Sequence, residues 1–259
     1  MTWTTQPRSN LSGLAAVTRG AGPTLLLLHG VGLRAEAWGA QLDLPARIVA
    51  PDMAGHGESP WSGDKMSLED YALAALDLLK DLDAPAIVVG HSMGAMLALE
   101  LASRAPDLVK GVAALNAIFE RSQPAQKFVQ GRAAQLDGKS ITDQTPTLER
   151  WFGTAASDAR EACASWLSDV NPAAYKCAYT AFATSQSPDR KGLSQVTCPA
   201  LFITGSEEPN STPAMSKAMA ALAPKGRSII VDGAAHMMPM THPNEVNAAL
   251  VSLISEVSS

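Results

Sequence analysis

The sequence has few cysteines and no excess of basic residues, and each shortage excludes a class of protein. Only three of its 259 residues are cysteines, Cys163, Cys177 and Cys198. Their number is odd and none has C-x-x-C spacing, so neither a disulfide framework nor a zinc site is indicated. The net charge of −5 offers no basic stripe that could neutralise phosphates, and we therefore expect no nucleic-acid partner.

Long apolar runs are also missing. The densest one, TLLLL at residues 24–28, is far too short to span a bilayer, and the first twenty residues hold no apolar stretch of signal-peptide length. We expect a soluble, cytoplasmic protein without a membrane partner. With 46% apolar and 17% charged residues, the composition is that of a globular chain with one core and, at most, an inserted lobe.

Short apolar runs alternate with helical patterns along most of the chain. The runs have the length of buried parallel strands and lie at residues 24–28, 46–50, 86–89, 109–115, 200–204 and 227–231. Residues 67–82 repeat apolar side chains at helical spacing, with Ser67 and Asp70 in capping-box positions. This alternation predicts an α/β fold with a mostly parallel sheet and helices on both of its faces.

The alternation stops in residues 121–192, where TLERWFG and NPAAYKCAYTAFA are typical of short amphipathic helices. We expect a helical cap there, inserted into a core made of residues 1–120 and 193–259. The aromatic side chains of the cap either form its own core or line a pocket, and Trp151 is the best candidate for contact with a substrate. Arg132 and Arg150 either bind a substrate carboxylate or are solvated surface residues.

The segment GHSMG at residues 90–94 fits the pattern G-x-S-x-G between a predicted strand and a predicted helix. In that context the serine, Ser92, lies on a sharp turn that exposes its hydroxyl, and the glycines leave room for close backbone contacts. A serine hydroxyl is a weak nucleophile, so acyl transfer requires a histidine base that is oriented by a carboxylate.

Two histidines, His236 and His242, follow Ser92 in the sequence. We favour His236 as the base because it comes after the strand at 227–231, at the edge where open α/β sheets place their sites. His242 precedes a proline, and we expect it on the surface near a helix start.

The choice of the orienting acid is less direct. The loop after the strand at 200–204 carries Glu207 and Glu208, and Asp232 lies four residues before the favoured base. Asp52 precedes the serine and violates the chain order serine, acid, histidine. We favour Glu208, with Glu207 and Asp232 as alternatives.

Acyl transfer also needs two amides that stabilise the developing oxyanion. The residue after the serine, Met93, supplies one of them. The strand at 24–28 is followed by His29, and then by glycines that let the Val31 amide turn inward to supply the second. We interpret His29 as a structural residue that braces this loop.

Together, LLLLHGVG, APDMAGHGES, VVGHSMG, ITGSEEPNSTP and GAAHMMP resemble the signature segments of the α/β-hydrolase superfamily over essentially the whole chain. The resemblance implies the α/β-hydrolase fold, with Ser92 as nucleophile, His236 as base, and Val31 and Met93 as oxyanion amides. Most members carry an aspartate where this chain has Glu208, although glutamate serves in some serine hydrolases. The cap segments are similar to the 3-oxoadipate enol-lactonase branch, which opens small lactones in aromatic catabolism.

These features predict an esterase or lactonase that hydrolyses a small ester or lactone through an acyl-enzyme on Ser92, with no cofactor and no metal. One alternative is a carbon–carbon bond hydrolase for ring-cleavage products that uses the same residues. Another is a ligand receptor on the same fold that does not turn over. The oligomeric state stays open, and a homo-oligomer is compatible with the sequence.

Overall fold

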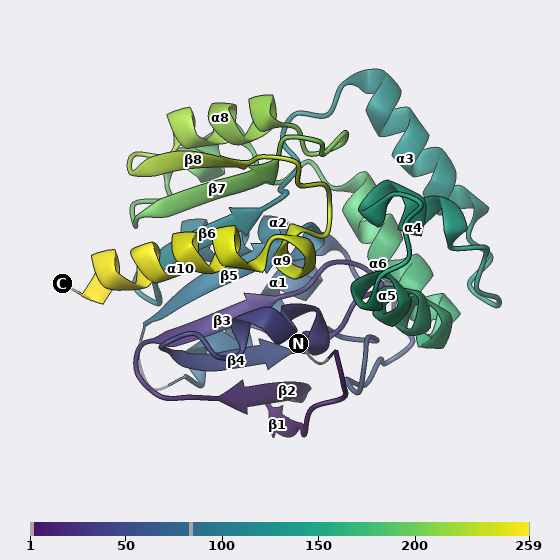
Figure 1. The fold of residues 1–259 in the computed structure, drawn as a ribbon, viewed down its shortest axis with the longest axis horizontal. Coiled ribbons are helices and arrows are strands. Elements are labelled where there is room, and N and C mark those ends of the chain that lie inside the picture. The colour runs from purple at the N-terminus through teal and green to yellow at the C-terminus, as the bar shows by residue number, and fades with distance from the viewer. Residues whose placement is uncertain (1–2, 83–84, 259) are drawn as a thin grey trace.

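A single sheet forms the centre of the computed structural model, which describes residues 3–82 and 85–258 (Figure 1). Within those residues, eight strands follow the order β1-β2-β4-β3-β5-β6-β7-β8. Pairing is parallel from β4 to β8 and antiparallel at the β1–β2 and β2–β4 edge. The strands are Ser9–Leu11 (β1), Leu14–Arg19 (β2), Thr24–Leu28 (β3), Arg47–Pro51 (β4), Ala86–His91 (β5), Val109–Leu115 (β6), Ala200–Gly205 (β7) and Gly226–Val231 (β8).

All six apolar runs in the sequence form strands close to their expected ends, which confirms the α/β class. The hairpin of β1 and β2 was not expected from the sequence. β1 is three residues long and mostly exposed, and β2 is apolar on its buried part only. Edge strands of this kind are solvated on one side and need no continuous apolar run.

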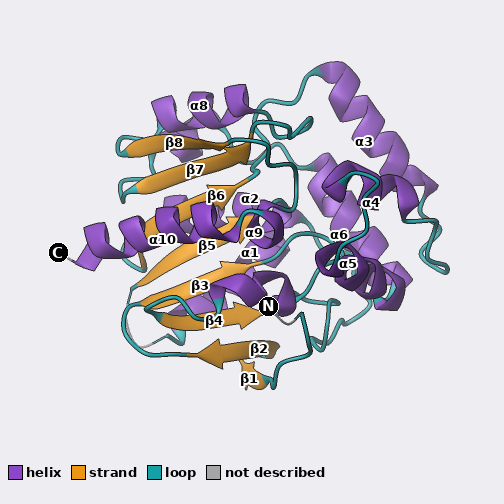
Figure 2. Cartoon of the chain, viewed as in Figure 1, coloured by secondary structure: helices purple, strands orange, loops and turns teal. Residues whose placement is uncertain are grey.

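The two faces of the sheet are covered by different helices (Figure 2). In β3, Leu26 and Leu28 share a buried cluster with α1, α2 and α8, whereas Leu25 and Leu27 share another with η1 and α10. This alternation follows from the two-residue period of a strand. The covering helices are η1 (Ala35–Gln41), α1 (Leu68–Lys80), α2 (Met93–Arg104), α8 (Pro213–Leu222) and α10 (Pro243–Ser258). No helix in the described part of the chain is long and apolar enough to cross a membrane.

The predicted capping box begins α1. The Asp70 amide donates to the Ser67 hydroxyl at 3.2 Å, and the Ser67 amide donates to the Asp70 carboxylate at 2.7 Å. Each side chain thus satisfies an amide that the helix leaves unpaired at its start. Leu68, Tyr71 and Leu78 are buried, as the helical spacing predicts.

Between β6 and β7 the chain leaves the sheet and forms a helical insertion, which we define as α3–α6. Its helices are α3 (Gln123–Gln135), α4 (Thr145–Phe152), α5 (Asp158–Asp169) and α6 (Pro172–Thr184). They lie beyond the carboxyl ends of the parallel strands (Figure 1). The short α7 (Arg190–Ser194) overlaps the segment expected in the cap, but it packs against α2 and α8 of the core.

A buried ion network ties the N-terminal segment to the sheet edge. The Arg8 guanidinium donates to both Glu36 oxygens at 2.7 Å and to Asp52 at 3.0 Å. The three side chains are at most 5% exposed. Burial opposes the charge on Glu36, but the bonds from Arg8 and from the backbone outweigh it and lower its pKa to about 2. Asp52 also accepts from the amides of Ala35 and Glu58, so the network fixes η1 and the loop after β4.

Replacing Arg8 with Ala should destabilise the fold by about 3–5 kcal/mol, because two buried carboxylates lose their counter-charge. Urea unfolding followed by circular dichroism measures this change. The matched control is Arg19→Ala, which breaks an exposed pair with Asp43 and should cost less than about 1 kcal/mol. Equal effects of the two substitutions would contradict the importance of the buried network.

Candidate active site

Ser92 lies on a strained turn between β5 and α2. Its backbone has φ 57° and ψ −118°, and its amide donates to the Leu115 carbonyl at 2.9 Å. A Cβ at Gly90 would collide with the carbonyl of Gly94, and a Cβ at Gly94 would collide with the carbonyl of Leu28. The two glycines of the motif therefore have the steric purpose that the sequence predicts.

The structure brings the favoured base and the favoured acid together. Glu208 follows β7 and His236 follows β8, the neighbouring strand, and His236 Nδ1 lies 2.7 Å from Glu208 Oε2. The other carboxylate oxygen accepts from the amides of Asn210 at 2.8 Å and Ser211 at 3.3 Å. Burial of Glu208 opposes its ionised form, but His236 and these amides outweigh burial and lower its pKa to about 2. Glu208 is thus a carboxylate at neutral pH, and the proton on Nδ1 points towards it.

The alternative residues lie elsewhere. Glu207 is exposed, and the carboxylate of Asp232, also exposed, accepts from the Ser206 hydroxyl at 3.4 Å. His242 bonds to the neighbouring Thr241, and Asp52 belongs to the buried ion network. None of these side chains contacts His236, which leaves Glu208 as its carboxylate partner.

Two residues that the sequence did not single out hold the backbone of His236. His91 Nε2 lies 2.8 Å from the His236 carbonyl oxygen, and Asn116 Nδ2 donates to the same oxygen at 2.7 Å. Burial, with a contribution from His236, lowers the pKa of His91 to about 3, so His91 is neutral and its Nε2 carries the donated proton. The available signal was position, because His91 lies inside the motif and Asn116 directly follows β6 at the same sheet edge.

The expected oxyanion amides lie on either side of the serine. Within the described residues, the amides of Val31 and Met93 have no hydrogen-bond partner. Gly30 adjoins Ser92, since a Cβ at Gly30 would lie 3.1 Å from the Cβ of the serine. His29 braces this loop, as the sequence predicts: its Nε2 accepts from the Met53 amide at 2.9 Å, and its Nδ1 donates to the Gly30 carbonyl at 2.7 Å.

Ser92 and His236 form no hydrogen bond with each other in the described structure. The ring of His91, the residue that precedes Ser92, lies 4.8 Å from the ring of His236 between centroids. Catalytic hydrogen bonds are often long in free enzymes and tighten when substrate binds.

The helical insertion supplies one wall of the site. The Trp151 ring stacks on His236 at 5.5 Å between centroids and 23° between planes. Trp151 is also part of the buried cluster of the insertion, so it serves both as core and as site wall. Its contact with a substrate stays a prediction.

Two arginines lie beside this wall. Burial and the charge of Arg132 lower the pKa of Arg150, while Tyr179, Glu208 and Tyr175 act in the opposite direction. Arg132 donates to the Thr147 hydroxyl and lies over the ring of Tyr179 at 5.4 Å. Neither guanidinium forms an ion pair with any residue that the structure describes.

A metal centre has no visible ligand set. No three His, Cys, Asp or Glu side chains in residues 3–82 and 85–258 gather closely enough to hold a metal ion. The cysteines are free thiols, and burial raises the pKa of Cys163.

A model of the alpha/beta hydrolase family matches residues 25–249, a span that contains Ser92, Glu208 and His236. The chain belongs to the alpha/beta hydrolase family. This membership confirms the superfamily resemblance and the fold class drawn from the sequence, and it supports hydrolase activity.

Known relatives of this alpha/beta hydrolase include the (E)-2-((N-methylformamido)methylene)succinate hydrolase of Acinetobacter baylyi, which is 37% identical over 90% of each chain. Among solved structures, the enol-lactonase of Burkholderia xenovorans superposes with a TM-score of 0.79 at 22% identity, covering 96% of this chain and 100% of its own. An E-2-(acetamidomethylene)succinate hydrolase superposes with a TM-score of 0.78 at 24% identity, covering 93% and 95%. These two structures share the fold.

The low pKa of Glu208 predicts how this hydrolase responds to acid. Because the folded pKa of about 2 lies below the usual glutamate pKa of 4.5, the unfolded chain binds a proton first as pH falls. Glu208 therefore stabilises the fold above the unfolded pKa, and this contribution is lost towards pH 2. In urea unfolding, the stability difference between wild type and Glu208→Gln should shrink from about pH 5 to about pH 3.

The control for this measurement is Glu207→Gln, since Glu207 is the exposed neighbour in the same loop. Its stability difference from wild type should stay nearly constant over the same range. A constant difference for Glu208→Gln as well would show that the buried carboxylate is not preferentially ionised in the folded state.

Proposed function

We propose that this protein is a serine hydrolase that removes the N-acyl group from a small unsaturated dicarboxylate of the 2-(acylaminomethylene)succinate type. The observation that carries the proposal is the stacking of Trp151 on His236, because Arg150 directly precedes Trp151 on α4 and forms no ion pair with a carboxylate that the structure describes. The relative from A. baylyi, at 37% identity, is named for a substrate of this type.

The first half-reaction forms an acyl-enzyme. The Ser92 oxygen attacks the acyl carbon while its proton passes to His236 Nε2, and the carbonyl electron pair moves onto oxygen. The amides of Val31 and Met93 donate to that oxyanion. The ionised Glu208 stabilises the imidazolium. As the oxyanion collapses, the C–N bond breaks and the nitrogen takes the proton from His236.

The second half-reaction regenerates the serine. Water attacks the acyl carbon, His236 takes its proton, and the tetrahedral intermediate expels the Ser92 oxygen, which recovers a proton from His236. The products are the free acid and an aminomethylene-succinate. Its nitrogen is conjugated through the C=C bond to a carboxylate, which spreads the developing charge and makes it a better leaving group than a simple amine.

Arg132 and Arg150 bind the two carboxylates of the substrate. Their guanidinium groups are half-buried and have no protein carboxylate to neutralise them, so a dianionic substrate supplies the missing charge. Trp151, whose ring stacks on His236, provides an apolar surface beside the substrate's carbon skeleton.

Ester or lactone hydrolysis, the activity expected from the sequence, is the second candidate. It requires the same nucleophile, base and oxyanion amides, and the structural likeness to an enol-lactonase favours it at the level of the fold. The leaving group separates the two candidates, since it is a nitrogen in one and an oxygen in the other. A carbon–carbon bond hydrolase and a receptor without turnover are further outcomes of the same substrate test.

The purified protein should release acid from (E)-2-(acetamidomethylene)succinate or its N-methylformamido analogue over many turnovers, faster than from nitrophenyl esters or enol-lactones. Ser92→Ala should abolish turnover, and Glu208→Gln should reduce kcat on the order of 10⁴-fold by leaving the histidine unoriented. Glu207→Gln should retain activity. Turnover of a lactone alone would favour the second candidate, and the absence of any turnover would favour a receptor.

Replacing Arg150 with Gln should raise KM for the dicarboxylate about 10- to 100-fold, because one charge-assisted hydrogen bond to a carboxylate contributes roughly 1.5–3 kcal/mol. Hydrolysis of neutral 4-nitrophenyl acetate should change little. The control Arg104→Gln removes an exposed arginine that pairs with Glu69 and should leave both substrates unaffected. Equal losses on the two substrates would indicate a structural role for Arg150.

A further inference from the structure

Some arginines of this chain form ion pairs with carboxylates, and others do not. Those that form ion pairs with described carboxylates are Arg8, Arg19, Arg34, Arg104, Arg190 and Arg227. Those that form none are Arg121, Arg132, Arg150 and Arg160. All four of the second group lie between β6 and β7. These four arginines are thus grouped in one segment of a chain whose net charge is −5.

One of these four, Arg121, has a guanidinium group whose hydrogen bonds are incomplete. Its guanidinium carbon lies 4.4 Å over the Phe182 ring, and its Nη1 makes long bonds to Gln126 at 3.4 Å and to the Phe182 carbonyl at 3.3 Å. Its Nη2 is buried without a hydrogen-bond partner. Burial without a carboxylate lowers the pKa of Arg121 to about 10, so it stays charged at neutral pH and its hydrogen-bonding capacity is unfilled.

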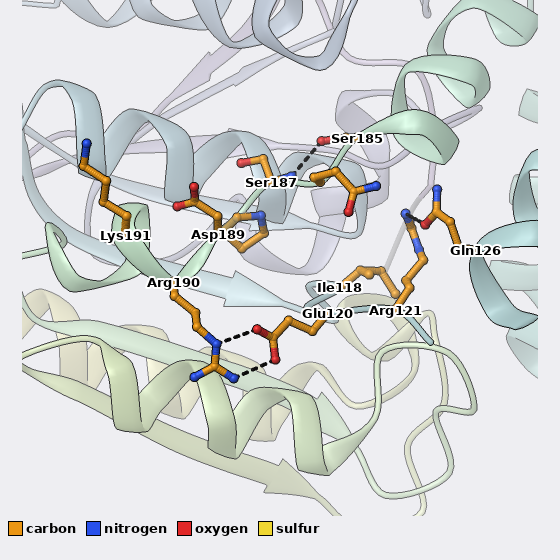
Figure 3. Close-up of a pocket in the computed structure, with 11 residues that line it drawn as sticks. Ile118, Glu120, Arg121, Gln126, Ser185, Ser187, Asp189, Arg190 and Lys191 are labelled. Atoms are coloured by element: carbon orange, nitrogen blue, oxygen red, sulfur yellow. Dashed lines mark hydrogen bonds and ion pairs between the residues drawn. The ribbon is translucent and has the colours of Figure 1, made fainter. Parts of the chain in front are cut away.

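A groove of about 480 Å³ adjoins this side chain (Figure 3). It is lined by Ile118, Glu120, Arg121, Gln126 and the segment 185–191, with Arg121 at one end and Lys191 at the other in the view of Figure 3. Its two carboxylates are already engaged, since Glu120 pairs with Arg190 at 2.6 Å and Asp189 accepts from the Gly192 amide at 2.6 Å. The three cations Arg121, Arg190 and Lys191 outnumber the two carboxylates, Glu120 and Asp189, so the lining of the groove carries a small excess of positive charge.

Aromatic contacts connect Arg121 to the arginines of the active site. Phe182 lies edge-on to Tyr179 at 5.9 Å, and Tyr179 in turn lies under Arg132 at 5.4 Å. Arg132 acts electrostatically on Arg150, the neighbour of Trp151. Cations and aromatic rings therefore alternate from the groove towards Trp151, which stacks on His236. The face of an aromatic ring stabilises a guanidinium group but does not neutralise its charge.

We propose that the groove is an outer binding site for carboxylate anions, anchored by Arg121, which collects the anionic substrate before it reaches Arg132 and Arg150. The inference rests on the proposed function in one respect, that the substrate is an anion. A cleft with an excess of positive charge raises the local concentration of anions, and the effect weakens as salt screens it. On a chain with net negative charge, such a site offsets the repulsion that a dianion otherwise meets.

The test compares two esters that share a leaving group, neutral 4-nitrophenyl acetate and the anionic mono-4-nitrophenyl ester of succinic acid. At low ionic strength, Arg121→Gln should lower kcat/KM for the anionic ester about 3- to 10-fold, as expected for electrostatic steering, with kcat nearly unchanged. Glutamine can keep a bond to the Phe182 carbonyl, which limits disturbance of the fold. The difference from wild type should disappear at about 0.5 M salt.

Arg19→Gln is the matched control, since it also removes one positive charge but lies on β2 in an exposed pair. It should leave kcat/KM for both esters within error of wild type. An Arg121→Gln variant that hydrolyses the anionic ester as fast as wild type, or that loses both esters equally, overturns the outer site. If wild type prefers the anionic ester and only Arg150→Gln removes that preference, the result supports the proposed function and contradicts the outer site. If wild type shows no preference for the anionic ester, the result contradicts an anionic substrate, and with it the proposed function.

Discussion

The backbone of Ser92 is the constraint on which the site depends. An L residue at φ 57° between a strand and a helix is strained, and it persists only because the surrounding structure determines it. Gly90 and Gly94 permit the necessary backbone approach, and the bond from the Ser92 amide to Leu115 anchors the turn to β6. The elbow therefore presents the hydroxyl and the Met93 amide in one fixed relation.

The other parts of the site are arranged around that elbow by neighbouring strands. The carbonyl of His236 receives bonds from His91 and Asn116, and its ring receives the carboxylate of Glu208. These three partners follow or end β5, β6 and β7, so the sheet register controls where the histidine lies although His236 itself is on an irregular loop. Buried polar groups that are fully paired in this way rigidify a site, and His91 contributes because burial keeps it neutral.

Local sequence was enough to predict much of this arrangement. Ser92 was predictable because the five-residue motif contains the glycines that its tight turn requires. His236 was predictable because it follows a strand, and parallel strands bring their carboxyl ends to one edge of the sheet. Asn116 was not, since its role requires knowing that the chain after β8 returns across β6. The partnership of Arg8 with Glu36 and Asp52 likewise joins segments 28 and 44 residues apart, and no periodicity records such a contact.

The core and the helical insertion differ in whether their buried charges have partners within the protein. In the core, the buried carboxylates of Glu36, Asp52 and Glu208 all receive charged or amide donors, and each is already saturated by the protein. In the insertion, Arg132 and Arg150 are half-buried without a carboxylate, so their charge is available to a ligand. In the proposed reaction, the core performs the acyl transfer and the insertion selects the substrate by its charge. The proposal thus assigns the choice of substrate to residues of the insertion, and the chemical steps to the elbow, the base and its carboxylate.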